Sequence, residues 1–505
     1  MRRYIPLAIL LLTTTVSVSH AQPPVPKPAP VSEAMHLTVR ASNTFACELF
    51  RRFASAEPGK NAFFSPWSIS SALAMTMEGA RNDTATEMGT VLGLPKELRL
   101  VGVRPWNIEP YHQGFAEMQR RCTPPRDLLK DEAGRARIAK LRSELNALNI
   151  QIQKGKFDVQ TKAEKLAGEI NQIEAQFDQY ELNIANAIWG EQTYPFEQAY
   201  LNAVAQHYGK DLAHNADFIN NFPRERDTIN KWVEQQTKDK IKDLIPEMPP
   251  EVARLIRMIL VNAIYFKGQW NEPFKKASTQ PEVFTLFDGT KTKTPLMRGH
   301  LPARYAAFNA DGSAFDTPRV IGFDTKKESL YPADDGFVLV DLPYKSNRLA
   351  MTLIVPRSPK GLAEIEKKLT GNALTLWTEK LQPRNVQVWL PKFKMDTTYE
   401  LGDTLKAMGM PLAFNERLAD FSGMSKSKQE PLHISRVIHK AFVDVNEEGT
   451  EAAAATAVIM AVPTSAPANF PFTPEVKADR PFAFVIREID TGAVLFMGRM
   501  TTPGK

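Results

Sequence analysis

Only two of the 505 residues are cysteines, Cys47 and Cys122, so the fold does not depend on a disulfide framework. Sequence leaves two alternatives open, a single bond between them or two buried thiols. Beyond the N-terminal region the chain lacks an apolar run long enough to cross a bilayer, which predicts no membrane partner. The net charge of +6 is small for 63 basic and 57 acidic residues, and no dense basic stripe predicts a nucleic acid partner.

Motifs that support catalysis are also missing. The chain has no Gly-x-Ser-x-Gly elbow, no His-Glu-x-x-His, no Gly-rich phosphate loop and no Cys-x-x-Cys. Its eight histidines are scattered without the spacing of metal ligands. We therefore expect no catalytic residues, no metal site, no cofactor and no enzyme activity.

The N-terminus has the pattern of an export signal. Arg2 and Arg3 precede an apolar stretch at residues 5–18, and small residues at Ser19 and Ala21 suit a cleavage site. This pattern predicts a signal peptide over 1–21, a Pro-rich linker over 22–33, and a protein in the periplasm or secreted to the extracellular space.

The most informative segment lies near the C-terminus, between strand-like runs at 441–445 and 481–486. It begins Glu447-Glu448-Gly449-Thr450-Glu451 and continues as a run of alanines. Alanine brings little surface to bury, and a plain linker would contain more Gly, Ser and Pro. This composition favours a segment that leaves one place and fits into a crowded other one.

Residues 124–180 differ in pattern from the rest of the chain. Ile138, Leu141, Leu145 and Leu148 fall at alternating steps of three and four, and the rhythm returns after a turn at Gly155. This spacing predicts an antiparallel coiled-coil hairpin. The hairpin either lies on the body or holds a protein partner or a second copy; we favour the first alternative, and a monomer, because charged residues cover the outer faces.

Around this segment the chain has a globular pattern. A helix is predicted over 34–56, and a cap at Ser65 or Ser68 begins the next helix. The nearly continuous apolar run at 258–266 predicts a strand buried on both faces, in which Asn262 needs a hydrogen-bond partner. Residues 299–335 are predicted to form a long loop or hairpin insertion.

Several motifs in one order resemble the serpin family of protease inhibitors. They occupy residues 61–69, 260–270, 390–394, 419–424, 434–441, the hinge-like 447–456, 479–484 and 495–499. The resemblance implies an α+β serpin fold with a large central β-sheet, two further sheets, about nine helices and an exposed reactive loop. It covers one domain at 34–503, and departs from the family at 124–180, near 299–335 and after the reactive site.

The resemblance implies a suicide inhibitor that covalently traps a target serine protease when its loop is cleaved and inserts as a strand. The implied hinge comprises Glu447, Gly449, Thr450, Glu451, Ala452, Ala453, Ala454, Ala455 and Thr456. Strand alternation would turn Thr450 and the small residues at 452, 454 and 456 inward and leave Glu451 outward. This pattern favours an inhibitor over the alternative, a non-inhibitory binding or scaffold protein that uses the coiled-coil arm.

The reactive bond has three candidates. Counting from Glu447 places the primary specificity residue at Pro463, whereas the family's frequent Pro-x-Ser ending places it at Thr464, and Val462 is the third choice. We prefer Thr464–Ser465, and the absence of Lys and Arg here favours an elastase-like or subtilisin-like target. The resemblance also implies a sheet-opening cluster of Ser68, Asn262, His439 and Trp270.

Overall fold

The structure, a computed structural model, describes residues 30–122, 131–153, 157–174, 180–322, 325–345, 347–427, 431–450 and 469–503. Twelve α-helices lie within these residues, where about nine were expected. They are α1 Glu33–Ala56, α2 Pro66–Gly79, α3 Asn82–Val91, α4 Glu109–Cys122, α5 Glu132–Gln153, α6 Gln160–Glu174, α7 Gln198–Tyr208, α8 Phe218–Gln236, α9 Pro250–Ala253, α10 Leu362–Lys368, α11 Gly371–Glu379 and α12 Gly402–Met408.

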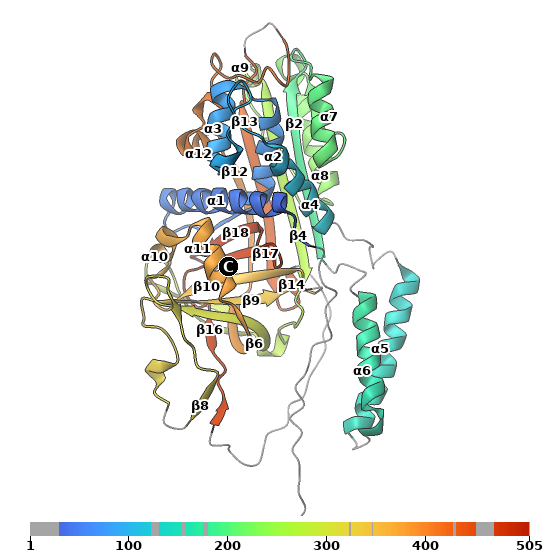
Figure 1. Cartoon of the computed structure of the whole chain (residues 1–505), viewed down its shortest axis with the longest axis vertical. Helices are drawn as coiled ribbons and strands as arrows, with labels where there is room; N and C mark the ends of the chain where they lie inside the picture. The colour runs from blue at the N-terminus through green and yellow to red at the C-terminus, as the bar shows by residue number, and fades with distance from the viewer. Residues whose placement is uncertain are drawn as a thin grey trace, which may run out of the picture.

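The described strands form three sheets, as Figure 1 shows. A ten-stranded sheet has the order β1 (Ala62–Phe64), β18 (Val494–Met500), β17 (Phe482–Glu488), β10 (Leu349–Pro356), β9 (Phe337–Pro343), β6 (Lys291–Phe308), β11 (Gln382–Pro391) and β16 (Glu475–Lys477), and β5 (Gln280–Thr285) and β7 (Ala314–Phe315) also pair with β6. A six-stranded sheet has the order β12 (Phe393–Glu400), β13 (Arg436–Asn446), β14 (Gly449–Thr450), β4 (Met258–Gln269), β2 (Tyr180–Glu191) and β3 (Ala213–Ala216). The third sheet pairs β15 (Asn469–Pro471) with β8 (Val320–Gly322). The α+β prediction with a large sheet and two further sheets is confirmed.

Strand β4 divides the hydrophobic interior into two layers. Leu260, Ile264 and Phe266 belong to the main core, which includes α1 and α2, whereas Ile259 and Val261 join a second core with α8. Successive side chains of a strand point to opposite faces, so an unbroken apolar run suits a strand covered on both sides. The prediction of a doubly buried strand at 258–266 therefore agrees with the structure.

Helix α2 begins where its sequence predicts. The Ser65 side chain accepts a hydrogen bond from the Ser68 backbone N–H, and Pro66 occupies the first helical position. A capping hydroxyl and a proline with no N–H to lose both suit a helix N-terminus. This cap places Ser68 in the first turn, directly beneath the six-stranded sheet.

The prediction of a loop or hairpin over 299–335 is correct only for the residues after Phe308. Strand β6 continues to Phe308 and pairs with β11 from Leu296↔Pro391 to Tyr305↔Gln382. Gly299 and Pro302 lie within this strand, and pairing with β11 and β9 outweighs their low strand propensity. The insertion begins after Phe308 and carries β7 and β8.

Helices α5 and α6 pack against each other and stand to one side of the sheets in Figure 1. Ile138 and Ile173 are buried between them and Leu141 packs against the pair. Two helices thus lie where the sequence predicts them, while coiled-coil geometry and a partner for the arm remain predictions. Among the described helices, none has the length and apolar character to span a membrane.

Candidate functional site

The predicted hinge enters the six-stranded sheet between β13 and β4. These two strands pair in parallel from Arg436↔Ile259 to Phe442↔Tyr265. Beyond that ladder they separate, and β14 lies between them, antiparallel to both. Figure 1 shows β14 at the end of the long strands. The first two residues that would form an inserted strand are therefore already in the sheet.

Gly449 is fixed by a close backbone contact. Its φ is +149°, and a Cβ at this position would lie 2.1 Å from the carbonyl oxygen of Gly268. Only glycine tolerates both the backbone angle and the approach. The missing side chain of Gly449 therefore lets β14 approach β4.

Glu447 attaches the start of the hinge to neighbouring elements. Its carboxylate lies 2.9 Å from Lys392 Nζ and accepts a 2.8 Å hydrogen bond from the Thr279 hydroxyl. Its carbonyl oxygen accepts from the Phe274 N–H at 2.8 Å. Burial alone would raise the pKa of Glu447, but these hydrogen bonds, led by the one from Lys392, outweigh burial and lower the pKa.

Trp270 lies at the same end of the sheet. Its indole Nε1 donates to the Asn446 carbonyl at 2.9 Å, and its backbone N–H donates to the Glu448 carbonyl at 3.0 Å. Its ring stacks on Tyr344, with 4.7 Å between centroids. Glu448 also pairs with Lys276 at 2.7 Å, but the lysine is mostly exposed, so this pair contributes little to stability.

The other three residues predicted to form the sheet-opening cluster meet beneath the β13–β4 ladder. Asn262 Nδ2 donates to Ser68 Oγ at 2.6 Å, and His439 Nδ1 bonds Asn262 Oδ1. All three side chains are fully buried. His439 and Asn262 are direct partners across the ladder, so the strands cannot separate here without breaking this hydrogen bond.

Sequence reasoning missed a fourth member, Asn186. Its Oδ1 accepts from Ser68 Oγ at 2.8 Å and from Asn262 Nδ2, and its Nδ2 donates to the Ser68 carbonyl at 3.1 Å. Asn186 lies directly opposite Asn262 in the β2–β4 register. The sequence does show an amide inside the strand-like run at 182–189. Only the strand register reveals that this amide faces Asn262.

His439 is neutral in this network. Its Nε2 lies 3.0 Å from the Ser65 backbone N–H and must accept, so the proton resides on Nδ1 and is donated to Asn262. Burial lowers the pKa of His439 to about 3. The cluster thus satisfies its polar groups without any net charge beneath the sheet.

Other predicted site residues lie outside the described residues. These are Glu451, Ala452, Ala453, Ala454, Ala455 and Thr456 of the hinge, and Val462, Pro463, Thr464 and Ser465 around the reactive bond.

Cys47 and Cys122 are described and are buried thiols rather than a disulfide. Burial raises the pKa of the Cys47 thiol to about 12, so it is not a reactive nucleophile.

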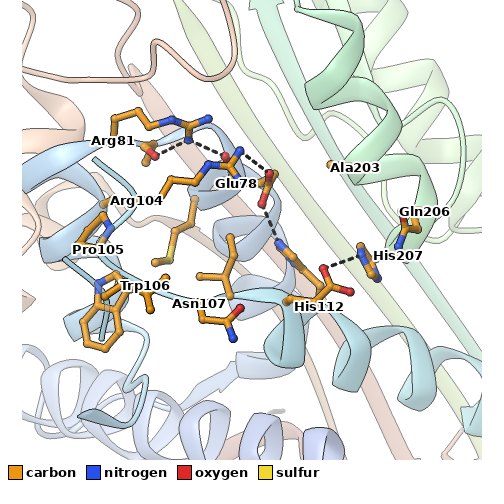
Figure 2. Close-up of a pocket in the computed structure, with 16 residues that line it drawn as sticks. Glu78, Arg81, Arg104, Pro105, Trp106, Asn107, His112, Ala203, Gln206 and His207 are labelled. Atoms are coloured by element: carbon orange, nitrogen blue, oxygen red, sulfur yellow. Dashed lines mark hydrogen bonds and ion pairs between the residues drawn. The ribbon is translucent and has the colours of Figure 1, made fainter. Parts of the chain in front are cut away.

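A separate cavity of about 230 Å³ opens between α2, α4 and α7. Figure 2 shows Glu78 between Arg104 and His112. The Glu78 carboxylate lies 3.1 Å from Arg104 and 3.3 Å from His112, and His207 lies 3.4 Å from Glu109. These ionisable groups are engaged with one another. In the part of the chain that the structure describes, no group of three His, Cys, Asp or Glu side chains is placed to hold a metal ion.

Comparison with known proteins decides the family. The chain matches the family described as Serpin (serine protease inhibitor) over residues 40–503. The chain belongs to the serpin family. Serpin B10 of Sorex araneus is 34% identical over 91% of this chain and 98% of its own length, and Serpin B4 of Homo sapiens is 34% identical over 93% and 100%. The solved structure of human thyroxine-binding globulin matches with a TM-score of 0.67 and 26% identity, covering 94% of this chain and all of its own.

Membership of the serpin family supports a protease inhibitor with a protease as its partner, rather than an enzyme. The comparison also corrects the predicted location. Serpin B10, Serpin B4 and Serpin B3 are intracellular clade B serpins, so the prediction of a secreted or periplasmic protein is wrong. The assignment of residues 1–21 as a signal peptide loses its support with it. An apolar stretch after two arginines is a compositional pattern, and it did not identify the compartment.

Proposed function

We propose that this serpin is a suicide inhibitor that covalently traps an elastase-like or subtilisin-like serine protease. The observation that carries the proposal is β14, a two-residue strand that is antiparallel to β13 and β4 and lies where they separate. Residues from Glu451 onward would extend this strand along the seam. The polar cluster of Ser68, Asn186, Asn262 and His439 then marks the part of the seam that opens.

The chemical step is acyl transfer at the reactive bond. The protease serine oxygen attacks the Thr464 carbonyl carbon, the bond to the Ser465 nitrogen breaks, and that nitrogen leaves with a proton. The product is an ester between the protease serine and Thr464. Pro463 and Val462 remain the alternative positions for this ester.

Insertion would exchange one strand pairing for two. The seven paired positions from Arg436 to Phe442 would separate from β4, and the loop would pair with both strands. Each net hydrogen bond contributes about 1 kcal/mol, so an added ladder favours the inserted state. Small residues at 452, 454 and 456 would fit the buried face.

We also propose that residues 34–503 form one serpin domain and that 124–180 is an insertion within it. The family match over 40–503 supports a single domain. Helices α5 and α6 occupy the inserted segment and pack mainly on each other. On this basis the arm is an addition to the inhibitor and has no part in the hinge.

The test mixes the protein with elastase and with subtilisin, followed by denaturing gels and mass spectrometry. A band near the sum of the two masses should survive denaturation, and the released fragment should begin at Ser465. Cleavage by both proteases without such a band would refute covalent trapping.

A non-inhibitory binding or scaffold protein is the second candidate. The position of α5 and α6 beside the body favours it, because an arm there is accessible to a protein partner (Figure 1). For such a protein, cleavage in the loop would leave heat stability unchanged.

A further inference from the structure

The chain that follows the reactive loop is paired with the insertion after Phe308. Strands β8 and β15 are antiparallel, with Val320 opposite Pro471 and Gly322 opposite Asn469. We name this pair the β8–β15 ribbon, comprising Val320–Gly322 and Asn469–Pro471. Two of the segments in which the sequence departs from the serpin pattern thus lie side by side.

Hydrogen bonds hold the ribbon to the segments around it. The Arg319 carbonyl accepts from the Phe472 N–H at 2.9 Å, and the Tyr331 hydroxyl accepts from the Glu475 N–H at 2.8 Å. Arg384 donates to the carbonyls at 317 and 318, at 2.6 Å each. These contacts fix where the chain emerges after the reactive loop.

The ribbon carries exposed apolar residues, and an exposed arginine immediately precedes β8. Val320 is 55% exposed, and Pro471, its direct partner in the register, is exposed beside it. Arg319 is also exposed. Burial lowers the pKa of Arg384, the nearby charge of Arg319 lowers it further, and Asp316 partly offsets both effects. The guanidinium groups of Arg319 and Arg384 therefore lie close enough to interact electrostatically. Two isolated strands are marginally stable in water, and a partner on this surface would stabilise them.

We propose that the β8–β15 ribbon is a docking surface for the target protease, beside its subsites for residues after the reactive bond. This inference rests on the proposed function. Thr464 and Asn469 are five positions apart, so they lie within about 18 Å even when fully extended. A protease of about 230 residues has a radius of gyration of about 17 Å. The ribbon therefore lies within reach of a protease bound at the reactive bond.

The chemistry of the surface defines the matching feature of the protease. On the protease, an apolar patch would match Val320 and Pro471, and a carboxylate near that patch would match Arg319. Only β15 follows the reactive bond, and its pairing with β8 keeps the ribbon on the body when the bond breaks and the loop moves. The ribbon therefore acts on encounter and cleavage, and the later movement of the protease does not involve it.

The test uses three variants of the full chain, V320D, R319E and V252D. V252D is the matched control, because Val252 is 46% exposed on α9, at the opposite end of the molecule from β8 in Figure 1. The measurement is the second-order rate of loop cleavage, by mass spectrometry, with whichever of elastase and subtilisin reacts faster. We expect V320D and R319E to slow cleavage about tenfold, V252D to stay within twofold of the parent, and the fraction of protease trapped to be unchanged.

R319E separates docking from folding of the ribbon, because the 319 carbonyl that bonds Phe472 is retained. Rates within twofold of the parent for both V320D and R319E would overturn the docking proposal, and a normal covalent complex would leave the suicide mechanism standing. Slower cleavage in both variants with no covalent complex would support the docking role of the ribbon and refute the suicide mechanism.

Discussion

At the residue scale, His439 couples the seam of the six-stranded sheet to pH. Burial lowers the pKa of His439 to about 3, from an ordinary value of 6.5. Between pH 3 and pH 6.5, His439 binds a proton in the unfolded chain but not in the folded chain. The stability contributed by neutral His439 is therefore complete above pH 6.5 and is lost as the pH falls toward 3, by up to about 1.4 kcal/mol per pH unit.

H439Q tests this coupling, because glutamine keeps a polar side chain that does not titrate. Between pH 6.5 and 4 we expect the free energy of unfolding, measured in urea, to fall less steeply in H439Q than in the parent. H36Q, at an exposed histidine of α1, is the control and should keep the parent slope. Equal slopes in the parent and H439Q would show that His439 does not titrate differently in the two states.

At the element scale, we expect the proposed hinge to determine whether the chain acts as an inhibitor or as a substrate. Thr450 pairs with Val445 on one side and Gly268 on the other, so the next residues would continue between β13 and β4. The alternation of a strand turns positions 450 and 451 to opposite faces. T450R would place a charge on the buried face, at a cost of several kcal/mol, whereas E451R would place it in solvent.

We therefore expect T450R to be cleaved as a substrate, with at least about a tenfold rise in the number of molecules consumed per protease inactivated. E451R should inhibit with a stoichiometry close to the parent. Titration of elastase or subtilisin activity against each variant measures this number. Inhibition by T450R at the parent stoichiometry would contradict insertion along this seam.

Sequence predicted the elements whose signal is local. The apolar run at 258–266 and the cap at Ser65 need only neighbouring residues to be recognised, and both lie where expected. The cluster partner Asn186 and the pairing of β8 with β15 depend on strand register between distant segments, which local patterns do not encode. The extent of β6 beyond residue 299 was missed for the same reason, since its partners β9 and β11 lie further along the chain.

At the scale of the whole molecule, the arrangement of β14 predicts that the uncleaved chain is not in its most stable state. The β13–β4 ladder is a single parallel pairing, and a loop freed at one end would add a strand antiparallel to both. Parallel pairing is slightly less stable per residue than antiparallel pairing, so both new ladders favour the inserted form. At about 1 kcal/mol per added hydrogen bond, a strand along this seam contributes several kcal/mol.

Cleavage within 451–468 should therefore raise the melting temperature of the parent by about 10 °C or more, although it breaks the chain. Calorimetry before and after limited cleavage by subtilisin measures the change, and mass spectrometry confirms one cut within the loop. The same cut in T450R should give a much smaller rise, because the charge at position 450 opposes insertion while the broken bond is identical. An equal rise in both chains would mean that the gain comes from the cut itself, and no rise in the parent would favour the scaffold protein over the inhibitor.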